Sequence, residues 1–269
     1  MGQGIATSYL QIFSEQLQIP VKQLKVVQGD TDLVEGHGSV GSRSLFVGGN
    51  AILRGIEDFL EECKQLAASE LEASVEDLEY HQGNFQVKGT RVGIGIFDLC
   101  SRQSDNSISV KRKKELTGRS WPNGCHVAEV EIDAETGEVR LDRYVSVDDV
   151  GNTVNPMIVH GQVQGGIASG LGQAVLERTE YDASGQLLSG SYMDYALPRA
   201  DDMPSLSGSL FEKAPCLTNP LGAKGTGEIG AVAGPPAIVH AVIDALAEKG
   251  ITQVDMPLQP QKIWECLNR

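Results

Sequence analysis

The sequence lacks the cysteine and histidine patterns that mark metal centres held by protein side chains. It has no Cys-x-x-Cys pair and no closely spaced histidines, and its five cysteines stand apart at Cys63, Cys100, Cys125, Cys216 and Cys266. A zinc ribbon or an iron–sulfur cluster needs such spacing, so we expect no metal ligand from this chain. An odd number of cysteines without a framework predicts a reducing, cytoplasmic setting.

The chain also lacks an excess of positive charge and any long apolar run. Its formal net charge of −14 argues against a nucleic-acid groove or an anionic membrane surface. No stretch approaches the ~20 apolar residues of a membrane span. With 269 residues, 41% of them hydrophobic, the chain is long enough for one large domain or two lobes with cores of their own.

Glycine is present in excess. The 31 glycines gather around residues 2–4, 36–49, 161–172 and 222–234 instead of being spread as linker. In the densest run, Asn219–Gly230, the carboxylate of Glu228 stands among four glycines, Lys224 and Thr226. Since a fixed glycine costs backbone entropy, such a run predicts a backbone that a ligand approaches closely, with one acidic group beside it.

Hydrophobic periodicity predicts an α+β protein. We expect helices over 5–17, 41–68, 95–102, 156–177, 235–249 and 259–268, and strands over 24–29, 76–88, 126–132, 138–147 and 186–195. Turn signals at 82–84, 133–137 and 182–185 indicate hairpins. Because the order lacks βαβ alternation, we predict mostly antiparallel sheets with packed helices in two lobes, 1–110 and 111–269.

No standard nucleotide motif explains the glycines. Gly222–Gly227 lacks the Gly-Lys-Ser/Thr ending of a phosphate loop, and no strand leads into Gly-x-Gly-x-x-Gly. A nucleotide-binding protein of another type remains an alternative. Each glycine segment alone could be a cap or a close helix contact. Together, near helix starts and with glutamines beside them, they predict a large polar cofactor.

Several short motifs follow one another in a specific order. They are Met1–Gly4 with Thr7, Gln28–Asp32, Gly41–Ser44, Val147–Gly151 with Asn155-Pro156, Gly161–Val163, Tyr192–Tyr195 and Gly222–Glu228. As an ordered set they resemble the molybdenum-cofactor-binding large subunit of the xanthine dehydrogenase, aldehyde oxidase and aerobic carbon monoxide dehydrogenase family. Asp148, Asp149 and Asn155 match as well, although turn and helix-cap roles explain them.

The resemblance implies roles for single residues and a cofactor, molybdopterin with molybdenum in its cytosine dinucleotide form. Residues implied to contact the pterin–dithiolene are Gly2, Gln3, Gly4 and Gln162. Those implied to hold the phosphate and dinucleotide are Gly41, Ser42, Arg43 and Ser44. Those implied to lie in the loop beside the cofactor are Lys224 and Gly225. Glu228 corresponds to the catalytic glutamate; the alternative is an acid at a helix end, satisfied by N–H groups.

The implied function is hydroxylation of a purine-like N-heterocycle, with water as oxygen source and Glu228 as base. Oxidation of carbon monoxide or an aldehyde, and a non-catalytic assembly fragment, are the alternatives. Since family subunits are longer, we expect the C-terminal part of a large subunit that is inactive alone. The implied partners are the N-terminal half of that subunit and subunits carrying iron–sulfur clusters and FAD.

Overall fold

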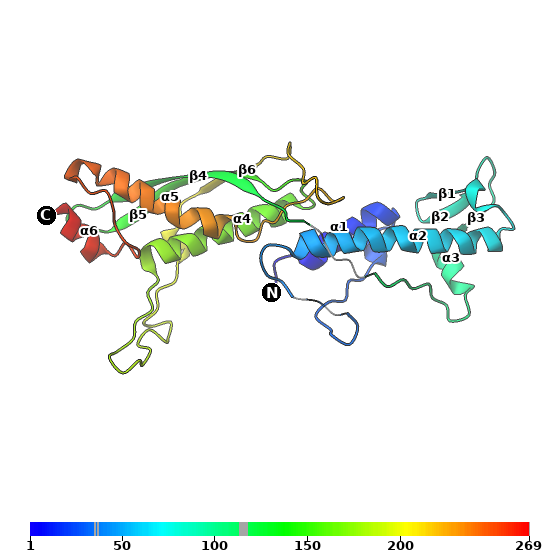
Figure 1. The fold of residues 1–269 in the computed structure, drawn as a ribbon, viewed down its shortest axis with the longest axis horizontal. Coiled ribbons are helices and arrows are strands. Elements are labelled where there is room, and N and C mark those ends of the chain that lie inside the picture. Colours follow the sequence, from blue (N-terminus) through cyan, green and yellow to red (C-terminus); the bar gives the residue numbers. More distant parts are fainter. Residues whose placement is uncertain (35, 37, 113–117, 269) are drawn as a thin grey trace. The chain divides into compact units, whose positions relative to one another are not determined.

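The computed structural model describes residues 1–34, 36, 38–112 and 118–268, and in them the chain forms two compact units (Figure 1). Unit 1 comprises Met1–Ser120 and Cys216–Ala223, and unit 2 comprises Trp121–Pro215 and Lys224–Arg269. The mixture of helices and small, mostly antiparallel sheets confirms the predicted α+β class. The two-lobe border predicted after residue 110 precedes this division and did not anticipate the return of Cys216–Ala223 to unit 1.

Unit 1 is built on two helices, α1 (Ile5–Leu17) and α2 (Asn50–Glu70). Antiparallel strands β1 (Leu78–His81), β2 (Asn84–Val87) and β3 (Gly93–Gly95) follow, and then α3 (Ile96–Ser101). The apolar face of α2 is buried because its residues recur at helical spacing. The core of unit 1 includes Ile56, Cys63, Ala67, Leu78, Phe85 and Leu99.

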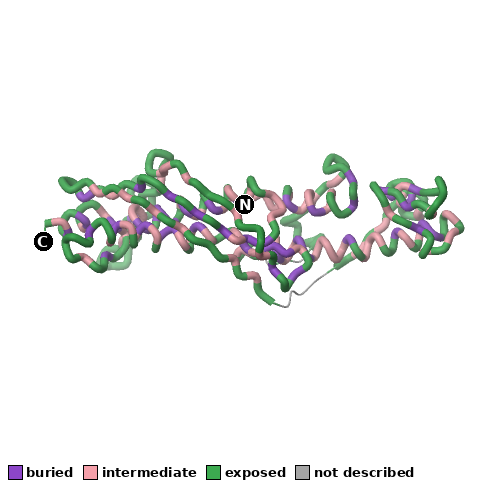
Figure 2. Tube along the Cα trace, turned by 90° about the horizontal axis from the view of Figure 1, so that it is seen from above, coloured by how far each residue is buried: buried purple, intermediate pink, exposed green. Residues whose placement is uncertain are grey.

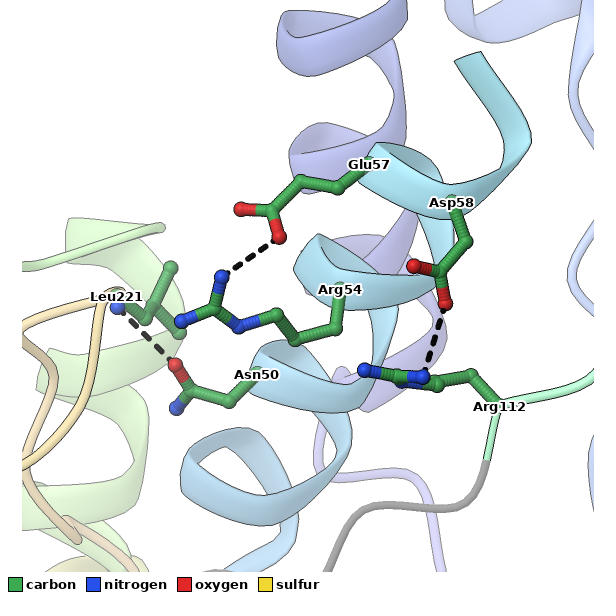
Figure 3. Close-up of polar contacts among 6 residues, drawn as sticks. All are labelled: Asn50, Arg54, Glu57, Asp58, Arg112 and Leu221. Atoms are coloured by element: carbon green, nitrogen blue, oxygen red, sulfur yellow. Dashed lines mark hydrogen bonds and ion pairs between the residues drawn. The ribbon is translucent and has the colours of Figure 1, made fainter. Parts of the chain in front are cut away.

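The segment Cys216–Ala223 is attached to unit 1 through the buried Asn50 of α2 (Figure 3). Asn50 accepts a hydrogen bond from the N–H of Leu221 at 3.1 Å and donates one to Asn219 Oδ1 at 3.1 Å. Asn219 donates in turn to the carbonyl oxygen of Ala223 at 3.1 Å. Buried amides of this kind are costly to leave unpaired, so Asn50 fixes the segment. The exposed ion pairs drawn beside it contribute little; they are Arg54–Glu57 and Arg112–Asp58.

Unit 2 has a sheet of strand order β4-β5-β6 with two helices on one face (Figure 1). β4 (Asn123–Ile132) and β5 (Val139–Asp149) form the predicted hairpin, and β6 (Leu206–Leu210) lies parallel to β5. The two helices on that face are α4 (Pro156–Leu171) and α5 (Ile229–Ala245), and α6 (Pro260–Leu267) follows them in the chain. Buried residues alternate with exposed ones along β5, and half-buried with exposed ones along β4. Figure 2 shows the burial of each residue along the chain. The core of unit 2 lies between the sheet and the helices and includes Leu141, Tyr144, Val163, Ile167, Ile238 and Val242.

α4 and α5 meet backbone to backbone where both carry glycine. A Cβ atom on Gly230 would lie 2.3 Å from the carbonyl oxygen of Val163, and one on Gly166 would lie 2.8 Å from Gly230 Cα. No side chain fits at either position. The contact therefore places the start of α5, next to Glu228, against the part of α4 that carries Gln162.

Four sequence predictions about elements were wrong. Residues 24–29 form no strand, and 186–195 contribute only the isolated bridge Tyr181–Leu187, because Ser191–Tyr195 folds into a hydrogen-bonded turn. Helix α5 begins at Ile229, so Pro235 and Pro236 lie inside it and do not start it. The predicted helix from 41 begins later, since Gly41 and Ser42 form a turn and Leu45–Gly49 is a π-helix. In the described residues no helix is long and apolar enough to cross a membrane.

We expect Gly230→Ala to lower the free energy of unfolding of unit 2 by about 1–3 kcal/mol, because the added methyl group overpacks the backbone of α4. Both tryptophans, Trp121 and Trp264, belong to unit 2, so denaturation followed by tryptophan fluorescence reports this unit. The matched control is Gly165→Ala, since nothing lies within 4 Å of a Cβ there. Equal effects of the two variants would contradict the close contact.

Candidate functional site

In unit 1 the glycine-rich start of the chain presents an open backbone at the beginning of α1. Gly2 and Gly4 both have φ of 81°, in the left-handed region that favours glycine, and Gly4 is the N-cap residue of the helix. Nothing lies within 4 Å of a Cβ at Gly2. The N-terminus of a helix offers free N–H groups and a positive dipole end, so this position suits a polar or anionic ligand.

Gln3 joins this start to the second glycine-rich segment. Its Nε2 donates to Ser39 Oγ at 2.8 Å, and Ser39 Oγ is hydrogen-bonded to Ser44 Oγ. Tyr9 also donates its hydroxyl to the carbonyl oxygen of Ser44, at 2.9 Å. The structure thus brings Gln3 and Gly41–Ser44 together, as the cofactor hypothesis requires. The roles of Ser39 and Tyr9 were not predicted, because neither stands in a recognisable motif.

The loop Gly41–Ser44 leaves both its backbone and its charge accessible. Gly41 has φ of 61° and Ser42 of 53°, and nothing lies within 4 Å of a Cβ at Gly41. Arg43 is exposed, and within the described residues its guanidinium has no ion-pair partner. A planar guanidinium binds phosphate in a bidentate manner, so the loop has the donors that a phosphate group needs.

Unit 2 carries the other implied residues. Gln162 is half-buried on α4, and the part of the chain that the structure describes offers its amide no hydrogen-bond partner. Glu228 is the exposed N-cap residue of α5, and its carboxylate makes no capping hydrogen bond.

Lys224 is fixed at the start of the Glu228 loop by a mostly buried ion pair. Its Nζ lies 2.6 Å from Asp149 Oδ2, and the two side chains are 10% and 13% exposed. Its backbone N–H donates to the carbonyl oxygen of Val150 at 2.7 Å, and Asp149 Oδ1 accepts from Gly151 N–H at 3.0 Å. The predicted turn role of Asp149 is confirmed, whereas its pairing with Lys224 was not predicted. Both contacts hold the loop that follows Lys224 to the end of β5.

The neighbouring strand end is held by a second buried polar group. His126 Nε2 lies 2.9 Å from Asp148 Oδ1, and His126 Nδ1 lies 2.9 Å from the hydroxyl of Tyr144. Burial raises the pKa of Tyr144, so its hydroxyl stays protonated. Asp148 is thus a buried sheet residue and no turn former, which corrects the sequence interpretation. The predicted cap role of Asn155 is confirmed, since its Oδ1 accepts from Ile158 N–H at 3.0 Å.

Comparison with known proteins gives consistent matches over the chain. A family model described as a molybdopterin cofactor-binding domain matches residues 1–204. The chain is 34% identical, over 98% of its length, to the 6-hydroxypseudooxynicotine dehydrogenase complex subunit gamma of Paenarthrobacter nicotinovorans. It is 33% identical, over 99% of its length, to the carbon monoxide dehydrogenase large chain of Hydrogenophaga pseudoflava. It spans 34% of the length of each of these relatives.

A solved structure agrees with these matches. Quinoline 2-oxidoreductase from Pseudomonas putida 86 superposes with a TM-score of 0.86 and 33% identity, covering 100% of this chain and 35% of that one. At this identity the likeness covers fold and sequence together.

We expect Lys224→Met to lower the free energy of unfolding of unit 2 by about 3 kcal/mol, because it leaves the Asp149 carboxylate buried without its cation. Denaturation followed by tryptophan fluorescence measures this free energy of unfolding. The control is Arg143→Met, which removes the exposed pair with Glu129 and costs less than about 1 kcal/mol. A loss at Lys224 no larger than at Arg143 would show that the ion pair does not anchor the loop.

Proposed function

Because this chain belongs to the family of molybdopterin cofactor-binding domains, we propose that it is the C-terminal part of a molybdenum hydroxylase large subunit. The family inferred from the ordered motifs is confirmed by the match over residues 1–204. The proposed reaction is hydroxylation of an N-heterocycle, in which water supplies the oxygen and Glu228 is the base. The proposed location is the cytoplasm.

The observation that carries this proposal is the chain of hydrogen bonds from Gln3 through Ser39 to Ser44. It brings two left-handed glycine segments side by side, and no side chain occupies the space over Gly2 or Gly41. These segments fit an elongated polar group with phosphates. We assign Gly2, Gln3 and Gly4 to the pterin, and Gly41–Ser44 to the phosphate and dinucleotide, in the cytosine form. When bound, the cofactor supplies the molybdenum that takes up the substrate's electrons.

In unit 2 the proposed roles follow from how each side chain is held. The Glu228 carboxylate accepts the proton released as an oxygen atom of water is transferred to the substrate carbon. Gln162 offers an amide donor and acceptor to the cofactor, and Gly225 offers its backbone. Lys224 acts through Asp149, since their ion pair fixes the loop that leads to Glu228. Proton acceptance needs a carboxylate at a defined place, which this anchoring provides.

The N-heterocycle is favoured by the name of one relative, quinoline 2-oxidoreductase. The second candidate is oxidation of carbon monoxide, favoured by the match to a carbon monoxide dehydrogenase large chain; aldehyde oxidation follows. Because the chain covers 34% of that relative, we propose that the N-terminal part of the large subunit is a partner. Subunits carrying iron–sulfur clusters and FAD are the further proposed partners, since electrons must leave the molybdenum.

In the complete enzyme we expect Glu228→Gln to lower kcat by about 10²–10⁴-fold, the usual contribution of a general base, with unchanged molybdenum content. Steady-state turnover and metal analysis of the same preparation measure both. Glu248→Gln is the matched control, because Glu248 is an exposed carboxylate just beyond the other end of α5. Wild-type turnover in Glu228→Gln would overturn the base assignment.

We expect the isolated chain to purify without molybdenum and without activity, since it spans only about a third of each curated relative it matches. Metal analysis of the pure chain, beside the complete large subunit purified from the same cells, tests this. Stoichiometric molybdenum in the isolated chain would contradict it.

A further inference from the structure

One face of the sheet in unit 2 has no layer over it among the described residues. Helices α4 and α5 lie on the other face, where alternate residues such as Tyr144 are buried. The outward residues of β4 and β5 are exposed, as expected for an antiparallel hairpin covered on one side. Figure 1 shows the two helices together on one side of β4, β5 and β6.

The outward face has two chemically different halves. Near the β4–β5 turn it carries ion pairs, Glu131 with Arg140 and Glu129 with Arg143. Toward the other end the cross-strand pairs are Cys125–Val147 and Val127–Val145. We define the apolar half-face as the outward residues of this end and the two aromatic residues that flank the strands: Trp121, Cys125, Val127, Val145, Val147 and Phe211.

The apolar half-face is exposed to a degree that an ordinary solvent-facing sheet avoids. Val127 is 60% exposed, Trp121 66% and Phe211 44%. The neighbouring outward positions on β6 are Ser207 and Ser209, which are uncharged. The next cross-strand pair toward the strand end is Asn123–Asp149, and the charge of Asp149 is paired with Lys224. Contiguous apolar surface of this kind marks an interaction site, and the centre of a protein interface is depleted of charge.

The apolar half-face borders the proposed site within unit 2. Val147 is followed directly by Asp148, which binds His126, and by Asp149, which holds Lys224. Whatever covers Val147 therefore also packs over the strand end that anchors the Glu228 loop. If the covering segment is present in every molecule, its contact with the sheet is permanent. Permanent interfaces are the most apolar, as this half-face is.

We propose that the apolar half-face is the surface on which the remaining part of the large subunit packs, through an uncharged aliphatic and aromatic surface of its own. This inference rests on the proposed function. The choice of this partner rests on the length of the relatives. The chain spans 34% of the two curated relatives compared above, and in them the remaining residues accompany the matching domain in each molecule. A second copy fits less well, since each copy brings a net charge of −14 of the same sign.

Cys125, inside the apolar half-face, is a natural reporter. All five cysteines lie in the described residues: Cys125 is exposed, Cys100 half-buried, and Cys63, Cys216 and Cys266 are buried. Burial raises the pKa of Cys63 to about 12 and also raises that of Cys100, so both thiols react slowly near neutral pH. A maleimide should therefore label Cys125 first, and Cys125→Ser should remove this fast phase.

The test compares labelling of Cys125 in the isolated chain with labelling in the complete enzyme. We expect a rate lower by about two orders of magnitude in the complete enzyme, as for a thiol reached only through local opening. Equal rates would overturn the proposal. A rate in the isolated chain that falls with protein concentration, together with a dimeric mass, would instead identify a second copy as occupant and would also overturn it.

A substitution provides the second arm. In the complete enzyme, Val127→Lys should reduce assembled complex at least about tenfold, equivalent to about 1.4 kcal/mol, whereas Val127→Ile should assemble as wild type. In the isolated chain Val127→Lys should unfold like the wild type, since the side chain is exposed there. Normal assembly of Val127→Lys would refute the interface. Because Glu228→Gln tests turnover in an assembled enzyme, failure of the base assignment is distinguishable from failure of the interface.

Discussion

The backbone contact between α4 and α5 is the constraint on which unit 2 depends. Gly230 and Gly166 leave no room for a Cβ, and Gly170 faces Gly234 and Pro235 in the same way. At this distance α4 and α5 cannot slide along each other, because the side chains next to the glycines would collide with rigid main-chain atoms of the other helix. Two consequences follow from this one contact. The start of α5, with Glu228 as its N-cap residue, is fixed against α4, and both helices contribute residues to the core that they share with the sheet.

Polar side chains hold the glycine-rich segments in place, and at Gly2 and Gly41 the backbone stays open. Gln3 binds Ser39, Asn50 binds the segment 216–223, and Lys224 binds Asp149. These polar contacts fix the positions of the segments. They leave the space over Gly2 and Gly41 empty. Such an arrangement suits a bulky ligand, because the loops are ordered in advance and less conformational entropy is lost on binding.

The sequence predicted most of the periodic elements, since α1, the β4–β5 hairpin and α6 depend on local spacing and turn residues. It failed where a distant partner decides the local structure. Residues 24–29 have strand-like composition without a neighbouring strand in the described residues, and β6 has a Leu-Ser-Gly-Ser-Leu sequence that forms a strand only because β5 lies beside it. For the site, motifs identified Gln3, Gly41–Ser44 and Glu228 as candidates. The anchoring residues Ser39 and Asn50 were not found, because a single Ser or Asn has no pattern of its own.

Unit 1 is discontinuous in the sequence, because Cys216–Ala223 belongs to it although the whole β4–β5–β6 sheet comes in between. Asn50 donates locally to the carbonyl oxygen of Phe46 at 2.6 Å, but it reaches Asn219 and Leu221 only when the chain has passed through unit 2 and returned. During synthesis, Asn219 and Leu221 leave the ribosome much later than Asn50, so these hydrogen bonds form late. The first unit cannot finish folding as an early, separate intermediate, and no single cut in the chain releases it whole.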